Sequence, residues 1–173
     1  MNLEIHPVSD RPDLLAPPVK EAVLRWAAAG VGVAEIDPEL ADTAAFCARY
    51  DQPLDESANC VVVAGKRGGQ TRMAACVVLA TTRADINGLV RKHLDVRKLS
   101  FAAMDDAVAQ TGMEYGGITP VGLPESWPIL IDAAVIATSK VVIGSGVRRS
   151  KLIVPGAALA DLPGAEVLTG LGR

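Results

Sequence analysis

The stretch GGITPVGLP, residues 116–124, has the residue types in this sequence that are best suited to chemistry carried out by the backbone. Three glycines and two prolines among nine residues exclude a regular helix or a central strand, because glycine leaves the backbone loose and proline fixes φ and lacks an N–H group. The stretch is therefore predicted to be a loop. Without Cβ atoms, such a loop brings its N–H and C=O groups close to a bound molecule. A structural double turn would use the same residues, so both interpretations stay open.

The side chains that most often act as nucleophiles or metal ligands are scarce. The chain has three cysteines, Cys47, Cys60 and Cys76, and two histidines, His6 and His93. Their number and spacing favour neither disulfides nor a Cys/His zinc site, so no metal or cofactor is predicted. A nucleophilic Cys60 would need a nearby base that neither histidine is placed to supply, and buried packing is favoured. His93, on an apolar helical face, is interpreted as a core or edge residue.

The elements around the loop follow from hydrophobic periodicity and from turn residues. Helices are predicted over 19–29, with Gly30 as C-cap, over 38–50, over 81–96, with Thr82 as N-cap, and over 104–111, with Gly112 just past its end. Strands are predicted over 32–37, 57–65, 73–81, 96–101, 129–131, 141–144 and 151–154, and 66–72 is a hairpin loop. A helical turn is expected over 133–137, and a short last helix begins at Pro155 and Gly156 and ends at Pro163.

The order of these elements predicts an α+β fold, because hairpins and helices do not alternate regularly. The apolar runs CVVVA and ACVVLA, from residue 60 and from residue 75, are nearly continuous. They indicate strands that are covered on both faces, so helices should pack outside the sheet. Residues 1–18, with four prolines, are predicted to be an irregular lead-in, and residues 19–173 a single domain.

Composition sets further limits. The chain has 173 residues, of which 50% are hydrophobic, 21% charged and only 3% aromatic, as expected for a globular domain with an aliphatic core. A formal net charge of −3 argues against a general nucleic-acid coat and leaves room for a local basic face. No apolar stretch has the length of a membrane span, and the first residues lack a leader pattern, so a cytoplasmic protein is expected.

The order of residues 19–170 resembles the YbaK and prolyl-tRNA synthetase associated domain family of aminoacyl-tRNA deacylases. The most specific part is Thr111–Gly112 followed by GGITPVGLP, then Asp132 after an apolar strand, then a glycine-rich strand end. Residues 116–120 match the GxxxP element of that family, whose backbone is thought to hold the scissile ester and the attacking water. The resemblance implies a mixed, partly closed β-sheet with helices packed outside.

The resemblance also has two departures. Where the family usually carries a lysine before the first long strand, this chain has Asn59, which offers neutral donors and an acceptor in place of a charge. Relatives read VSAG or VSGG where this chain reads VVIGSG, so Gly144 takes the place of their serine and Ser145 is displaced by one position. A shift of one residue turns a strand side chain to the opposite face.

The resemblance implies a set of site residues. Asn59, Gly116 and Gly117 are expected to be catalytic, and Ile118, Thr119, Pro120, Gly122, Asp132, Gly144, Ser145 and Gly146 to bind substrate. Asp132 could orient the loop or a substrate amine, or it could simply cap the helical turn that follows.

Two functions remain open on this basis. One is a freestanding deacylase that hydrolyses the ester of a mischarged tRNA without a metal, at a reduced rate because of Asn59. The other is a weak or inactive module that binds tRNA, a synthetase or a small ligand. The expected partner is the aminoacyl-tRNA acceptor end, with a synthetase as a second partner. Two clusters of basic residues would either contact the phosphates of the tRNA acceptor end or form a solvated surface. One cluster is Lys66, Arg67 and Arg72, and the other is Arg148, Arg149 and Lys151.

Overall fold

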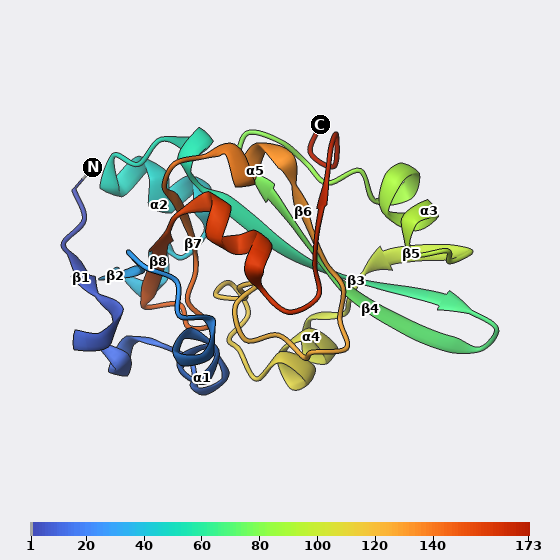
Figure 1. Ribbon diagram of the computed structural model, residues 1–173, viewed down its shortest axis with the longest axis horizontal. Coiled ribbons are helices and arrows are strands. Elements are labelled where there is room, and N and C mark those ends of the chain that lie inside the picture. Colours follow the sequence, from blue (N-terminus) through green and yellow to red (C-terminus); the bar gives the residue numbers. More distant parts are fainter. Residues whose placement is uncertain (1) are drawn as a thin grey trace.

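The structure, a computed structural model, describes residues 2–173 and contains two β-sheets that lie side by side (Figure 1). The smaller sheet has the order β1-β2-β8-β7, and the larger has the order β5-β3-β4-β6-β9. The strands are β1 (Ile5–Pro7), β2 (Gly32–Glu35), β3 (Ala58–Arg67), β4 (Gln70–Leu79), β5 (Lys98–Phe101), β6 (Ile129–Asp132), β7 (Val141–Gly144), β8 (Ser150–Val154) and β9 (Ala165–Leu168). Strands β4, β6 and β9 run parallel and the other pairs antiparallel, which confirms the predicted mixed sheet.

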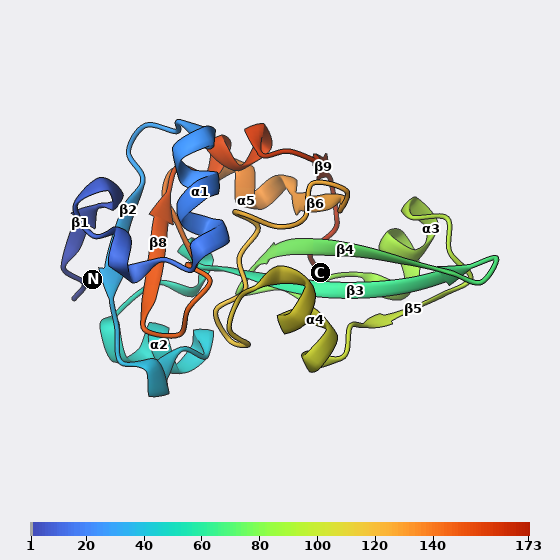
Figure 2. The ribbon, with the colours of Figure 1, turned by 90° about the horizontal axis from the view of Figure 1, so that it is seen from below.

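Short helices pack on both sheets. The α-helices are α1 (Pro17–Trp26), α2 (Thr43–Tyr50), α3 (Arg91–His93), α4 (Met104–Thr111) and α5 (Ala133–Ala137). A π-helical turn over Ile86–Val90 leads into α3, and 3₁₀ turns cover Val8–Asp10, Pro12–Leu14, Pro38–Leu40, Leu54–Glu56 and Gly156–Asp161. Seen from below, α1 and α4 lie in front of the strands (Figure 2). No helix among the described residues is long and apolar enough to cross a membrane.

The larger sheet is buried on both faces, as its continuous apolar runs predict. Alternate residues of one strand reach opposite faces, so Val62 packs into the main core between sheet and helices while Val63 packs beneath the turn that leads into α3. In β4, Val77 and Cys76 divide in the same way. Each fully buried valine contributes about 1.5–3 kcal/mol relative to exposure. A third cluster, centred on Phe46, lies between α2 and the smaller sheet.

The two sheets meet at β3 without closing into a barrel. Ser57, just before β3, forms an isolated parallel bridge with Val142 in β7. Strand β5 pairs with the same side of β3 only from Val63 onward. Between these two contacts, residues 58–61 are paired with β4 on one side only. The joint therefore leaves an open edge of β3, and this open edge is where the cavity described below lies.

Several predicted boundaries are wrong. Residues 1–18 are more regular than expected, since β1 pairs with β2 and Leu14 is fully buried. Helix α1 begins at Pro17, and Ala27, not Gly30, is its left-handed C-cap. The predicted helix over 81–96 is shorter than expected. Its helical residues begin at Ile86, and Asp85, not Thr82, is the N-cap residue. Both β1 and β9 were missed, because three or four residues of edge strand give too little periodicity to recognise.

Candidate active site

The predicted loop is packed backbone against backbone on the turn between β7 and β8. A Cβ on Gly144 would lie 2.6 Å from the carbonyl oxygen of Gly117, and a Cβ on Gly117 would lie 2.7 Å from the backbone of Val147. Real Cβ atoms do not approach so closely, so both positions require glycine. Gly116 has φ +92°, in the region that favours glycine. The glycines therefore allow two backbone segments to pack closely, and they also allow the chain to turn.

Hydrogen bonds hold this arrangement. The N–H of Gly146 donates to the carbonyl of Gly117 at 2.7 Å, and the N–H of Gly117 donates to the carbonyl of Glu114 at 2.9 Å. Arg148 donates through its backbone to the Glu114 carboxylate at 2.8 Å and through its guanidinium to the carbonyls of Tyr115 and Pro38. The loop is thereby tied to the β7–β8 turn and to the segment before α2.

A cavity of about 510 Å³ opens between this loop and the open edge of β3. Its lining includes Asn59, Gly116, Ile118 and Gly144 from the predicted site. The other lining residues are Ala41, Asp42, Thr43, Ala58, Cys60, Val61, Val62, Phe101, Ala102, Ala107, Tyr115 and Lys151. The sequence therefore identified four residues, from three distant segments, that the fold brings together around one cavity.

Asn59 is oriented by the start of α2. Its side-chain oxygen accepts a hydrogen bond from the hydroxyl of Thr43. Asp42 caps the same helix, and its Oδ1 accepts from the N–H groups of Ala44 and Ala45 at 3.1 and 3.2 Å. Because the Asn59 oxygen is engaged by Thr43, the amide NH₂ is the part that can donate to a molecule in the cavity.

The backbone groups of the loop are not equally free. Gly117 uses both its N–H and its carbonyl within the fold, and it does not line the cavity. Among residues 2–173, the N–H groups of Gly116 and Ile118 have no acceptor that meets hydrogen-bond geometry. The loop can therefore offer N–H donors at Gly116 and Ile118, whereas Gly117 supports the shape of the loop.

Other predicted residues lie outside the cavity lining. Gly146 and Ser145 are buried behind it. The Ser145 hydroxyl lies 3.1 Å from the carbonyl oxygen of Val147 and 3.0 Å from that of Ser150, either of which can accept its one proton, and it accepts from the Ser150 hydroxyl, so it is a structural group. The one-residue shift thus turned Ser145 away, as strand alternation requires.

The remaining predicted residues also lie apart from the lining. Thr119 and Pro120 are buried, and Gly122 packs against the carbonyl of Pro18. Asp132 is buried at the end of β6, where it is the N-cap residue of α5 without a side-chain capping bond. Its Oδ2 lies beside Gly172. These four residues support the loop and the sheet around the cavity.

The thiols of Cys60, which lines the cavity, and of Cys76, which is buried on the other face of the sheet, are poor nucleophiles. Burial, together with neighbouring Cys76, raises the pKa of the Cys60 thiol well above its ordinary range, and burial raises that of Cys76 to about 12. A thiol held neutral does not attack an ester. His93 has a partner that the sequence did not reveal, Glu166 in β9, with Nε2 3.1 Å from Oε1. Across the described residues, no three His, Cys, Asp or Glu side chains are placed to share a metal ion.

One residue of the cavity was misjudged from sequence. Lys151 was grouped with Arg148 and Arg149 as a surface cation, yet it is only 7% exposed and lines the cavity. The only sequence signal was its place in the otherwise apolar stretch KLIVP, two residues after Arg149. Register reveals its burial, since β8 lies between β2 and β7 and Lys151 pairs with Ala34 and Gly144.

Comparison with known proteins agrees with this geometry. A family model described as the aminoacyl-tRNA editing domain matches residues 37–162. The chain therefore belongs to the aminoacyl-tRNA editing domain family, which confirms the predicted YbaK-like resemblance.

Solved structures share the fold. A candidate trans-editing enzyme for prolyl-tRNA synthetase superposes with a TM-score of 0.77 at 20% identity, over 91% of this chain and 96% of that one. A hypothetical protein gives a TM-score of 0.78 at 20% identity, over 90% and 99%. A scaffold protein used for epitope grafting gives 0.76 at 21% identity, over 91% and 97%. At these identities the likeness concerns the fold.

Proposed function

We propose that this protein is an aminoacyl-tRNA deacylase that acts in trans and hydrolyses the ester linking a wrongly attached amino acid to tRNA. The observation that carries the proposal is that Asn59, Gly116 and Ile118 line one cavity. Its volume of about 510 Å³ lies in the range of small-molecule sites. Such an enzyme works where tRNA is used, so a cytoplasmic location remains our expectation.

Different groups of the cavity lining suit different parts of an aminoacyl ester. The N–H groups of Gly116 and Ile118 and the NH₂ of Asn59 are donors for the carbonyl oxygen and for an attacking water. Donors aimed at a developing oxyanion are a large source of rate enhancement. Asp42, an exposed carboxylate on the lining, offers a partner for the α-ammonium group of the amino acid.

The mouth of the cavity suits an unpaired nucleotide. Phe101 and Tyr115 line it, and these residues are 65% and 53% exposed. Aromatics are only 3% of the chain, so two exposed rings beside one opening are a concentrated feature. Exposed aromatic rings stack on nucleobases, with about 1–3 kcal/mol per base. We assign them to the terminal base of the tRNA.

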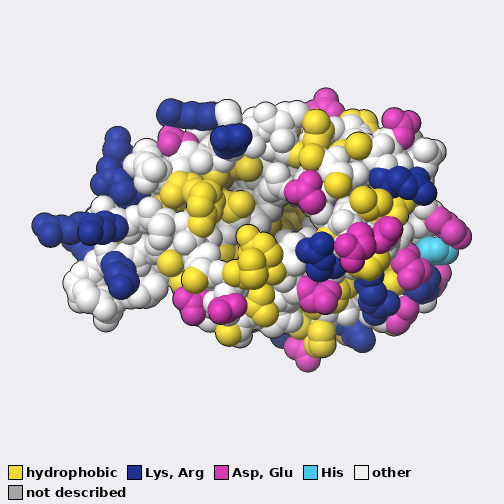
Figure 3. Space-filling model, turned by 180° about the vertical axis from the view of Figure 1, so that it is seen from behind, with side chains coloured by type: hydrophobic (Ala, Val, Ile, Leu, Met, Phe, Trp, Pro, Cys, Tyr) yellow, Lys and Arg dark blue, Asp and Glu magenta, His cyan; other side chains and the backbone are white. Residues whose placement is uncertain are grey.

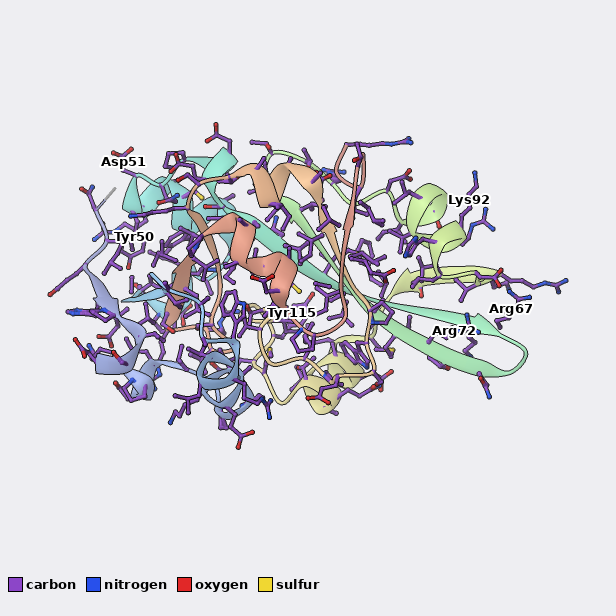
Figure 4. The ribbon with its side chains drawn as sticks, viewed as in Figure 1. Tyr50, Asp51, Arg67, Arg72, Lys92 and Tyr115 are labelled. Atoms are coloured by element: carbon purple, nitrogen blue, oxygen red, sulfur yellow. The ribbon has the colours of Figure 1, made fainter. Side chains whose placement is uncertain are left out.

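The hairpin of β3 and β4 is where phosphate contacts are proposed. Lys and Arg side chains gather at that end of the molecule (Figure 3). Arg67, Arg72 and Lys92 lie there together, away from Tyr115 (Figure 4). Strand β3 runs from the cavity to this end, and RNA that enters the cavity can follow it.

Salt dependence tests the hairpin assignment. If Arg67 and Arg72 each contact a phosphate, replacing both with alanine should reduce the slope of log K against log salt by about 0.7–0.9 per contact. Arg25, which lies in the last turn of α1 and not in the hairpin, supplies the control substitution Arg25→Ala. An unchanged slope would assign these arginines to a solvated surface.

The second candidate, a binding module without turnover, has one observation in its favour: Asn59 supplies a neutral group at the site. An assay on alanyl-, cysteinyl- and seryl-tRNA separates the two. We expect hydrolysis of at least one, with an Asn59→Ala loss of about 5- to 10-fold, the equivalent of one neutral hydrogen bond. Asn2→Ala, at an exposed position away from the cavity, should keep the wild-type rate. No turnover with retained tRNA binding would favour the module.

A further inference from the structure

Lys151 is a buried cation at the site without a buried anion beside it. Among the described residues that line the cavity, it is the only lysine or arginine. No carboxylate lies within ion-pair distance of its ammonium group in residues 2–173. A buried, unpaired charge is costly. A methionine would fill the same space without this cost, so the charge itself calls for an explanation.

The residues around the Lys151 ammonium group fix its position but do not use all of its N–H groups. Nζ donates one hydrogen bond, to the carbonyl of Ala41 at 2.9 Å, and lies 5.3 Å from the centre of the Phe46 ring. An ammonium has three N–H groups, so two remain. Burial lowers the pKa of Lys151, with opposing influence from Cys47 and Asp42 and a further lowering from Arg148.

Lys151 and Asn59 share one support. The lysine is bonded to the carbonyl of Ala41, and Asn59 is bonded to the hydroxyl of Thr43, two residues further along the same segment. Both residues line the cavity. The start of α2 thus places a charged donor and a neutral donor on one wall.

We propose that the Lys151 ammonium stabilises the negative charge that forms on the carbonyl oxygen of the aminoacyl ester during hydrolysis, through a hydrogen bond that becomes strong only when this charge has developed. This inference depends on the proposed deacylase function. Water adds to the carbonyl carbon, the oxygen becomes negatively charged beside Nζ, and the bond to the ribose oxygen then breaks. One proton of the water ends on the ribose oxygen, and the other leaves the new carboxyl group for solvent.

Lys151→Met tests the assignment because it keeps the apolar stem and removes the charge. We expect kcat for deacylation to fall about 100-fold, the loss typical of one oxyanion donor. The Kd for a non-hydrolysable amide analogue of 3′-aminoacyl-adenosine should stay within about threefold, since the charge acts on the transition state. Lys140→Met, at an exposed position outside the cavity, is the matched control.

The outcomes separate this inference from the proposed function. Wild-type protein that hydrolyses no aminoacyl-tRNA sinks the deacylase itself. A Lys151→Met variant with wild-type kcat, or one in which binding and kcat fall together with the unfolding temperature, overturns the inference and leaves the deacylase standing. If Lys151→Met does not fold, Lys151→Gln, which retains a neutral donor, must show the loss of kcat with Kd preserved.

Discussion

The two walls of the cavity are built on different principles. The glycine wall, residues 116–118 against Gly144, is backbone packed on backbone, with virtual Cβ contacts as short as 2.6 Å. The second wall, formed by the start of α2 with Asn59 and by Lys151 next to Gly144 in the sheet, presents side chains that are held by single hydrogen bonds. The glycine wall fixes shape, and any side chain added to it disturbs the fold. The other wall sets chemistry, and its groups can change while the fold remains.

The largest effect is expected from a change in the glycine wall. In Gly144→Ala, the new methyl group would lie 2.6 and 2.7 Å from the carbonyls of Gly117 and Ile118. We expect the free energy of unfolding to fall by about 2–3 kcal/mol, as for overpacked sites, and deacylation to be lost. Chemical denaturation and the tRNA assay measure both.

Gly170 supplies the comparison for Gly144. It has φ +78° with nothing near its virtual Cβ, so Gly170→Ala should cost about 1–2 kcal/mol for the left-handed backbone and keep its activity. Equal activity losses in the two variants would contradict the distinction between the walls.

A smaller effect is expected at the side-chain wall. Thr43→Val removes the hydroxyl that orients the Asn59 amide but keeps the shape of the side chain. We expect kcat to fall about 3- to 10-fold, close to the 1 kcal/mol of one hydrogen bond, with little change in the unfolding temperature. Thr138→Val, which removes the bond to the Ala134 carbonyl outside the cavity, should leave kcat unchanged.

Stability against pH gives a further test of the charged group. Burial holds the pKa of Lys151 below its ordinary 10.5 in the folded state. Between the lowered pKa of the folded state and the ordinary pKa of 10.5, the unfolded chain binds more protons than the folded protein. Wild-type stability should therefore rise with pH in that interval. Lys151→Met abolishes this titration, and its stability relative to wild type should be highest below that interval and decrease toward pH 10.5. Chemical denaturation at several pH values, with Lys140→Met as reference, measures this difference in the free energy of unfolding. A difference that does not change with pH would contradict the prediction.

The smallest effect is expected at Cys60. Its thiol lines the cavity but is held neutral by burial. Cys60→Ala should therefore leave deacylation within about twofold, with a stability loss of about 1 kcal/mol for the removed sulfur. A large loss of activity together with retained stability would assign the thiol a role that its pKa argues against.

Much of the fold could be read from local pattern. The Gly-Gly pair at 68–69 and the apolar runs on either side predicted the β3–β4 hairpin, which pairs from Ala58–Leu79 to Arg67–Gln70. The same runs predicted burial on both faces, because Val62 and Val63 cannot share a face. By contrast, β9 could not be predicted, because its four residues are a strand only through pairing with β6.

The site was predictable where backbone chemistry determines it. Gly116 has a positive φ and Gly144 packs against a backbone carbonyl, so both positions exclude a side chain. The glycines themselves are visible in the sequence. Lys151 was missed because a lysine beside two arginines resembles a surface group, and its burial depends on where β8 lies in the sheet. Ser145 was placed too near the cavity, because a glycine-rich strand end does not reveal which face each residue takes.

The open edge of β3 has a consequence for how the protein responds to a ligand. The carbonyl of Val62 is paired with Ala102 on that side, so strand alternation directs the backbone groups of Cys60 the same way, toward the cavity. A bound molecule can complete the ladder at the place where a tenth strand would otherwise sit. Amide hydrogen exchange at Cys60 should then slow on binding of an aminoacyl-adenosine analogue, as though the protein had gained a short piece of sheet from its own substrate.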